Sequence, residues 1–359
     1  MNFNDVISVY DKWLHIEDRD YIPVIYATIL ANRFDDTPVW LLIIGKSSSG
    51  KTVVIQNLEG CEEIYIISSI TANSLISAWK EKGDEDKSLI PKLDKKVLLI
   101  KDLSTIRTMY SEQKSMVLSQ LRDAYDGECG RATGLGVKKY KSKFGLIACA
   151  TPDYERQKIA ESMLGERFLT FKLQTPNFNK TIDKMVSSIG KKSQMEKEIR
   201  DSANKFLSSV FIKSIHKIKK TTLNNITKLS EILTTLRSPV SRDGYRRNID
   251  FPVESVEYPI RVSKNLICLY RALLELIPQE GCISIIKRIV KDSVPYERLK
   301  VMNCIKEGKN SYVDIKNHVK ISDRTMSEIL EEMTLLDILS KDVKGNYDIN
   351  LQYNLLYEE

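Results

Sequence analysis

The residues from 45 to 52 have the types and spacing of a phosphate-binding loop. The pattern G-x-x-x-x-G-K-[ST] is matched by Gly45-Lys46-Ser47-Ser48-Ser49-Gly50-Lys51-Thr52. Gly45 and Gly50 allow the backbone to fold tightly around an anion, so that N–H groups point at the α- and β-phosphates. Lys51 would then reach the β- and γ-phosphates, and the Thr52 hydroxyl would hold Mg²⁺.

The segments on either side of the loop fit this interpretation. Residues 39–44 are a run of branched and aromatic side chains typical of a buried strand, and residues 53–58 can open a helix. A strand, a phosphate loop and a helix in this order predict a site for ATP and Mg²⁺ in a parallel α/β sheet.

A second apolar run ends in an acid. Residues 97–102 read Val-Leu-Leu-Ile-Lys-Asp, and the carboxyl ends of parallel strands line the ligand crevice, so Asp102 would face the metal and ATP. Two registers remain open. In one, Asp102 holds the metal and no acid follows it. In the other, Lys101 stands at the metal position and Asp102 at the water-activating one.

Two further polar residues follow core strands. The apolar run 144–150 ends at Thr151, which would lie beside the γ-phosphate. Arg167 comes after this strand and is a candidate arginine finger that reaches the ATP of a neighbouring subunit. The simpler alternative for Arg167 is a solvated surface side chain.

Residues 127–143 have the pattern of a β-hairpin. Glycines flank a turn, and residues 137–143 alternate near the strand period. The hairpin would carry a basic arm made of Arg131, Lys138, Lys139, Lys141 and Lys143. Such an arm is either a solvated surface or a contact for a nucleic acid backbone.

Composition places the chain among globular proteins. It has 359 residues, 42% of them hydrophobic and 29% charged, with a formal net charge of +7 that is compatible with nucleic acid binding. No apolar run has the ~18 residues that a membrane span needs, and the N-terminus is unlike a signal peptide, so we expect a cytoplasmic protein. Six scattered cysteines without a C-x-x-C pair and three isolated histidines do not predict a zinc site.

The periodicity of the remaining segments predicts four parts. They are a helical leader (1–37), the α/β nucleotide-binding core (38–175), a helical lid (176–295) and a small C-terminal unit (296–359). Within the core, residues 71–82 are amphipathic and are expected to form a helix.

The C-terminal unit has the element order of a winged helix. Three helices are expected at 296–307, 312–319 and 322–336, followed by a hairpin over 338–349. The third helix carries Asp323, Glu328, Glu331 and Glu332 against only Arg324, a face that repels phosphate. A protein partner is therefore as well supported as DNA at this unit.

These motifs, in this order, resemble the AAA+ ATPases of the branch with a pre-sensor hairpin, which includes the MCM helicases. The resemblance covers roughly residues 38–295 and includes Leu164–Phe168, at the place of the finger motif, and Arg261, at the place of the sensor-2 arginine. The residues that flank the motifs also resemble those of ATPases encoded by phages and integrative elements. The chain differs by lacking an acid pair at Asp102, by Thr151 in place of asparagine, and by having no DNA-binding domain ahead of the core.

The resemblance implies an α/β P-loop AAA+ parallel sheet core with a helical lid, followed by the winged helix. It also implies a ring, usually a hexamer, whose hairpins line a central pore and grip single-stranded DNA. The expected function is an ATP-dependent DNA motor, the replicative helicase of a mobile element, with Lys51, Asp102, Thr151, Arg167 and Arg261 in the ATPase site. The alternatives are a non-motor switch, such as a helicase loader or a DNA-assembly regulator, and a monomeric nucleotide-binding module.

Overall fold

The computed structural model describes residues 1–34, 36–71, 73–77, 86–133, 136–154, 167–210, 217–240, 242, 249 and 257–358. In this part of the chain the helices are α1 (Phe3–Trp13), α2 (Tyr21–Ala31), α3 (Lys51–Gln56), α4 (Ser111–Tyr125), α6 (Phe178–Ser188), α7 (Lys192–Ser209), α8 (Lys220–Arg237), α9 (Ile260–Leu274), α10 (Gln279–Asp292), α11 (Tyr296–Lys306), α12 (Tyr312–Val319) and α13 (Asp323–Leu335). The strands are β1 (Trp40–Ile44), β2 (Ile64–Ile67), β3 (Val97–Ile100), β4 (Glu128–Thr133), β5 (Gly136–Lys141), β6 (Gly145–Ala150), β7 (Phe168–Lys172), β8 (Leu339–Lys341) and β9 (Tyr347–Ile349).

The chain divides into two compact units. The first comprises Met1–Ile218 and Ile267–Ile285, and the second comprises Lys219–Leu266 and Ile286–Glu359. The predicted lid, 176–295, contributes to both. None of the helices in the described residues is both long and apolar enough to span a membrane.

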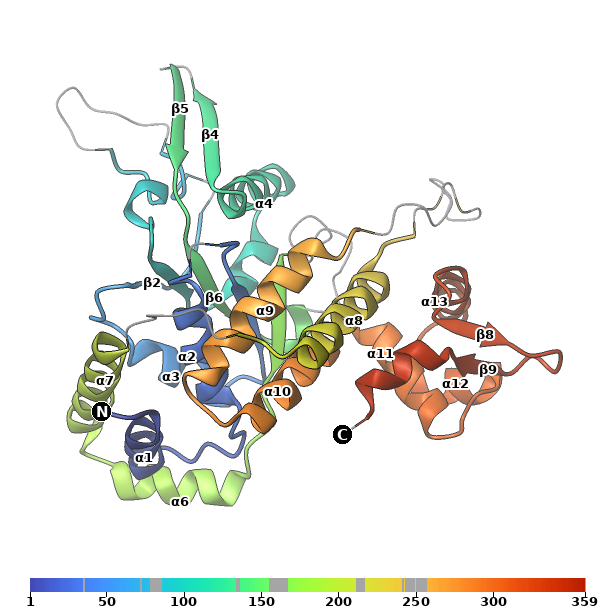
Figure 1. The fold of residues 1–359 in the computed structure, drawn as a ribbon. Coiled ribbons are helices and arrows are strands. Elements are labelled where there is room, and N and C mark those ends of the chain that lie inside the picture. The colour runs from blue at the N-terminus through green and yellow to red at the C-terminus, as the bar shows by residue number, and fades with distance from the viewer. Residues whose placement is uncertain are drawn as a thin grey trace. The chain divides into compact units, whose positions relative to one another are not determined.

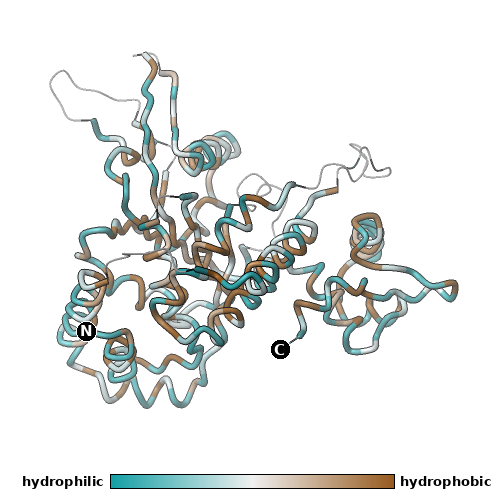
Figure 2. Tube along the Cα trace, viewed as in Figure 1, coloured by the Kyte–Doolittle hydropathy of each residue, from teal (hydrophilic) through white to brown (hydrophobic). Residues whose placement is uncertain are grey.

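A five-stranded parallel sheet organises the first unit, in the order β2-β3-β6-β1-β7 (Figure 1). The strands β1, β3 and β6 are buried along their whole length, as expected for strands covered on both faces. Figure 2 shows hydrophobic residues at the centre of this unit and hydrophilic residues along its outer helices. The predicted α/β class is therefore confirmed.

The N-terminal leader packs against the sheet unit as two helices. An Asn2–Asp5 capping box starts α1, which buries Phe3, Val6, Tyr10 and Trp13 on one face. Every residue of α2 is buried, because this segment is apolar all round. The predicted helical leader is confirmed over these two segments.

One predicted helix is wrong in the residues that the structure describes. Residues 73–77 form turns and bends, whereas the amphipathic pattern predicted a helix over 71–82. The backbone is instead bonded to the segment before β3, since Leu89 N donates to Ser74 O and Leu75 O at 3.1 Å. Residues 78–82 lie outside the described part of the chain.

The last part of the second unit has the element order that the sequence predicted. Three helices, α11, α12 and α13, precede the two-stranded β8–β9 sheet. The turn between the strands uses Gly345 at φ +89°, a left-handed conformation that favours glycine.

Candidate nucleotide site

The loop 45–52 connects the carboxyl end of β1 to the start of α3. Ser48 has φ +60° and Gly50 has φ +84°, and Gly50 directly precedes the first residue of α3. Gly45 is closely surrounded, because a Cβ atom there would lie 3.1 Å from Lys51 Cδ and 3.2 Å from Leu173 Cβ, and these neighbours would have to shift to admit it. The geometry of the loop therefore favours glycine at both positions.

The Lys51 side chain lies against the loop that precedes it. Its Nζ donates to Gly45 O at 2.6 Å and to Lys46 O at 2.7 Å, and the residue is only 8% exposed. Burial lowers the pKa of Lys51, while the nearby Cys149 and Asp102 act in the opposite direction. The ammonium group is thus held within the curve of the loop, where the motif would place phosphate oxygens.

Tyr21 of α2 fixes the junction between the loop and α3. Its hydroxyl donates to Lys51 O at 2.7 Å, and its ring stacks on Phe171 of β7 with 6.1 Å between centroids. The sequence analysis did not identify Tyr21, because an aromatic residue in an apolar helix carries no signal beyond core packing.

Asp102 and Thr151 meet at the same edge of the sheet as the loop. The register pairs Ile44 with Ala150 and Ile100 with Ala148, so the residues that follow these strands emerge close together. Gly45 N donates to Ala150 O at 3.2 Å, which brings the start of the loop next to Thr151.

Ser104 links the ends of β3 and β6. Its backbone N–H donates to Asp102 Oδ1 at 2.8 Å, and its Oγ accepts a long hydrogen bond of 3.5 Å from Thr151 N. The following turn begins with Leu103, which is fully buried, whereas Asp102 is exposed at the edge. Ser104 was also missed from the sequence, since a lone serine in a turn is not a signal.

The residues at this edge fit the magnesium ion that the motif implies. No cluster of three or more His, Cys, Asp or Glu side chains that could hold a metal ion occurs in the described part of the chain. Mg²⁺ is instead bound by one or two protein oxygens together with phosphate oxygens and water. Thr52 and Asp102 supply such oxygens, and Asp102 Oδ2 accepts no hydrogen bond from a described residue.

A pocket of about 550 Å³ lies beside the loop. One side is formed by residues 48–54 and the other by residues 13–18 of the leader and by α6 and the start of α7. Its lining includes the apolar residues Leu14, Ile16, Val53, Val54, Met185, Ile189 and Met195. An apolar pocket of this size next to a polar loop has the dimensions of a small-molecule site.

Hydrogen bonds tie the leader to the far side of this pocket. Glu17 Oε2 accepts from Asn177 N at 2.5 Å, and Asp18 Oδ2 accepts from Gln174 N at 3.1 Å. On α7, Glu198 accepts from Lys12 Nζ at 2.5 Å and from Trp13 Nε1 at 2.8 Å. Trp13 itself lines the pocket.

The β4–β5 hairpin is confirmed and projects away from the sheet in Figure 1. The pairing Arg131↔Lys138 places these two residues on one face, and Lys139 and Lys141 lie on the other. Lys143 follows the hairpin, where its backbone N–H donates to Asp94 Oδ1 at 3.0 Å.

The inner face of the hairpin is bound to the same chain. Arg131 Nη1 donates to Asn73 Oδ1 at 2.9 Å, and Lys138 Nζ lies 3.1 Å from Asp86 Oδ1. Tyr140 also donates a short hydrogen bond to Asp86. Burial raises the pKa of Asp86. Hydrogen bonds from Tyr140, Ser88 and Lys138 together outweigh this effect and hold the pKa of Asp86 well below its ordinary value.

The outer face is exposed. Lys139 is exposed, and Lys141 is 87% exposed with Glu128 Oε1 at 3.3 Å. The predicted basic arm of five residues is therefore divided, and only Lys139 and Lys141 present their charges on the outer face of the strands.

Arg167 lies at the opposite end of the sheet from the loop. The residue after it, Phe168, pairs with Trp40 at the start of β1, whose five residues span about 16 Å. Its side chain is 8% exposed, with Nη2 at 3.1 Å from Asp126 Oδ2 and the guanidinium over the Tyr125 ring. Arg167 is not brought to the loop of its own chain, and residues 164–166 of the finger motif lie outside the described residues.

The other predicted arginine belongs to the second unit. Arg261 lies in the first turn of α9, 3.2 Å from Glu257 Oε1.

The acidic face of α13 is engaged within the second unit. Glu331 lies 2.7 Å from Arg242, and Glu332 lies 3.1 Å from the buried Arg298. Arg298 also donates to Leu236 O and Ser238 O at 2.9 Å. Glu328 Oε1 likewise accepts from Arg324 Nε at 3.0 Å, and Asp323 Oδ1 lies 2.5 Å from Lys316 Nζ. All four acids that suggested repulsion of phosphate thus have internal partners.

Comparison with known proteins identifies no family. The chain matches none of the protein-family models searched, and a search of curated proteins finds no match.

Proposed function

We propose that this chain binds and hydrolyses ATP and acts on DNA as a ring-forming AAA+ motor, the replicative helicase of a mobile element. The observation that carries the proposal is the convergence of Lys51, Asp102 and Thr151 at the carboxyl edge of a parallel sheet, beside a pocket of nucleotide size. The strand β1, flanked by β6 and β7, provides the crevice where such sheets bind ligands.

The residues of the site have distinct roles in this proposal. The backbone of the loop and Lys51 bind the phosphates, and the apolar side of the pocket takes the base and ribose. Thr151 contacts the γ-phosphate. Thr52 and Asp102 hold Mg²⁺, which neutralises charge that develops on the phosphates.

The proposed DNA contact is the outer face of the hairpin. Lys139 and Lys141 are exposed on a projecting strand, where they reach phosphates without reading sequence. Lys143, Arg131 and Lys138 support the hairpin or its base. The helices α11–α13 and the β8–β9 hairpin form a winged helix that takes DNA or a protein partner.

Arg167 is proposed to act on the ATP of a neighbouring subunit. Its place at the far end of the sheet excludes contact with its own phosphate loop, as a finger supplied in trans requires. The Arg167 guanidinium must then leave the Asp126 carboxylate and bind phosphate oxygens when subunits meet. Arg261 is the proposed sensor of the lid.

A second candidate is an ATP-dependent switch that loads or assembles other proteins on DNA. Two observations favour it. The residue after Asp102 is the buried Leu103, so no acid follows Asp102 in the register that makes it the metal ligand, and Arg167 is held by Asp126 within its own chain. A switch needs ATP binding but little turnover.

The test is ATP hydrolysis with and without single-stranded DNA, with mass in solution measured in parallel. A motor shows DNA-stimulated turnover that is lost in Lys139→Ala/Lys141→Ala, and Arg167→Ala binds ATP without hydrolysing it. Binding of ATP with negligible turnover in both conditions would reject the motor and favour the switch. Absence of ATP binding would reject both.

A further inference from the structure

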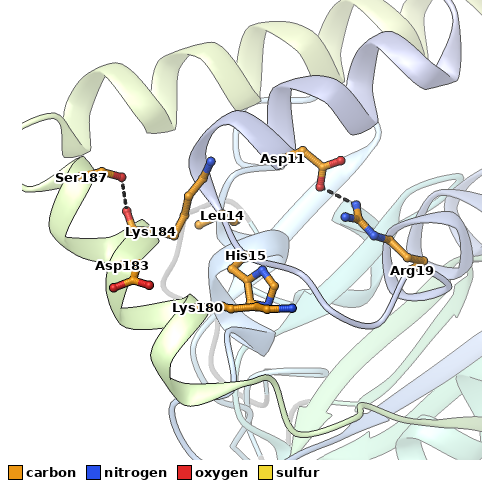
Figure 3. A pocket seen from close by; sticks show the side chains of 8 residues that line it. All are labelled: Asp11, Leu14, His15, Arg19, Lys180, Asp183, Lys184 and Ser187. Atoms are coloured by element: carbon orange, nitrogen blue, oxygen red, sulfur yellow. Dashed lines mark hydrogen bonds and ion pairs between the residues drawn. The ribbon is translucent and has the colours of Figure 1, made fainter.

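A second pocket of about 490 Å³ lies on the other side of the leader from the phosphate loop. It is formed by residues 11–19 and by α6 (Figure 3). Its lining includes the basic side chains of Arg19, Lys180 and Lys184 and the imidazole of His15. Figure 3 shows them arranged around one hollow, with contributions from both elements.

The charges of this pocket leave an excess of cations. Arg19 Nη1 is paired with Asp11 Oδ1 at 2.5 Å, so these two charges cancel. Lys180 and Lys184 lie one turn apart on α6, and neither has a carboxylate within 4.0 Å among the described residues. Like charges at this spacing repel, and Asp183 is the only other acid of the lining.

His15 stands between the two pockets and has an unsatisfied nitrogen. Its Nε2 atom is buried and makes no hydrogen bond to a described residue, and Glu17 Oε2 lies 3.7 Å away. A buried polar atom without a partner indicates a missing water, ion or ligand. Leu14, His15 and Lys184 line both this pocket and the one at the phosphate loop.

We propose that this second pocket binds a phosphate-bearing small molecule. The ammonium groups of Lys180 and Lys184 on a concave surface supply the charge-assisted donors that phosphate oxygens accept, and His15 Nε2 adds a polar atom without a protein partner. The volume exceeds that of one phosphate and suits a pyrophosphate or nucleotide group. The anion site does not depend on the proposed function, because it is argued from residues 11–19 and α6 and not from the loop 45–52.

The test uses inorganic pyrophosphate as the probe and calorimetry as the measurement. The full chain is saturated with ADP, so that the phosphate loop is occupied, and pyrophosphate is then titrated at low salt. The variant Lys180→Glu reverses one charge that lines only the second pocket. Its matched control is Lys191→Glu, an exposed lysine just beyond α6 that lines neither pocket.

We expect pyrophosphate to bind ADP-saturated wild-type protein. Lys180→Glu should weaken it by at least about tenfold, or ~1.4 kcal/mol, and Lys191→Glu by less than about twofold. Equal effects of the two variants, or no binding in the presence of ADP, would overturn the proposal. So would loss of single-stranded DNA binding in Lys180→Glu with pyrophosphate binding unchanged, because the surface would then serve DNA.

The variant Lys51→Ala separates this proposal from the nucleotide function. Pyrophosphate binding that depends on Lys180 should persist in Lys51→Ala, whose phosphate loop is impaired. If ATP does not bind the wild type but this pyrophosphate binding is present, the proposed function fails and the second site stands. If ADP binds and Lys180 has no effect on pyrophosphate, the second site fails and the proposed function stands.

Discussion

At the scale of single residues, the candidate site depends on backbone conformation more than on side-chain chemistry. Gly50 adopts a left-handed conformation where the loop turns into α3, and the Tyr21 hydroxyl fixes the next residue through its carbonyl. The Lys51 ammonium is in turn held by two carbonyls of the same loop. Small changes that leave Lys51 and Asp102 in place should therefore still impair nucleotide binding.

The first prediction compares two glycines with positive φ. Gly50 and Gly60 have φ values of +84° and +92°, and neither would bring a Cβ atom into a clash. Alanine should destabilise either position by about 1–2 kcal/mol. Only Gly50→Ala should also lower ATP affinity, by about tenfold or more. Thermal unfolding and ATP titration measure the two effects, and equal ATP affinities would contradict a phosphate loop here.

The second prediction concerns the Tyr21 hydroxyl. Tyr21→Phe leaves Lys51 O without its donor and should cost about 1 kcal/mol in the free energy of unfolding. Tyr10→Phe is a matched control, because Tyr10 is also fully buried and bonds the Tyr26 hydroxyl at 3.4 Å. We expect only Tyr21→Phe to weaken ATP binding. A similar loss in Tyr10→Phe would mean that the effect is general destabilisation of the leader.

At the scale of elements, the two faces of the β4–β5 hairpin have different surroundings. The strand period places Lys139 and Lys141 outside, and Arg131 and Lys138 against the segment that contains Asp86. The four basic side chains are close in sequence, but their surroundings differ because they lie on different faces of the hairpin. The two pairs should respond differently to removal.

The third prediction follows from this division. Lys139→Ala/Lys141→Ala should reduce the slope of log affinity for single-stranded DNA against log salt by about 1.4, without changing stability. Arg131→Ala/Lys138→Ala should instead lower the melting temperature, since both residues bond within the chain. Salt titrations and thermal unfolding of both variants test this. An unchanged slope in the outer variant would exclude that face as the DNA contact.

The fourth prediction concerns the hydrogen bonds that Lys12 and Trp13 of the leader donate to Glu198 of α7. The side-chain hydrogen bonds from Lys12, Gln194 and Trp13 lower the pKa of Glu198 to about 2, from an ordinary 4.5. A lowered folded-state pKa means that this contribution to stability is complete above pH ~4.5 and is lost as the pH falls toward ~2. Glu198→Gln should remove that part of the acid dependence. Trp13 fluorescence during acid titration measures the acid dependence. Identical titrations of the wild type and Glu198→Gln would contradict the prediction.

At the scale of the whole molecule, the loop 45–52 and Arg167 lie at opposite ends of the sheet. The loop follows the carboxyl end of β1, and Arg167 precedes the residue that pairs with the start of β1. The role proposed for Arg167 on ATP therefore requires a second subunit.

The fifth prediction tests this requirement by mixing variants. Lys51→Ala and Arg167→Ala should each be inactive alone, but a mixture should regain part of the ATPase activity, because an intact loop can then meet an intact Arg167. Recovery in the mixture is measured against each variant at the same total concentration. No recovery, together with a lowered melting temperature of Arg167→Ala, would show that Arg167 serves only to hold Asp126. Arg167→Lys is the control, since it keeps a charge for Asp126.

The local features could be predicted from the sequence, because they depend on short-range rules. The loop pattern at 45–52, the apolar strands, the hairpin and the order of the C-terminal helices are all set by spacing within a few residues. The amphipathic segment 71–82 shows the limit of these rules, since its hydrogen bonds to Leu89 replace a helix over residues 73–77.

Which distant residues meet depends on how the elements pack. The sheet register joined Asp102 and Thr151 through Ser104, and α2 placed the Tyr21 hydroxyl on Lys51 from thirty positions away. Packing also buried Arg167 against Asp126, although its sequence position suggested an exposed finger. Such contacts join segments far apart in the chain, so no pattern of neighbouring residues contains them.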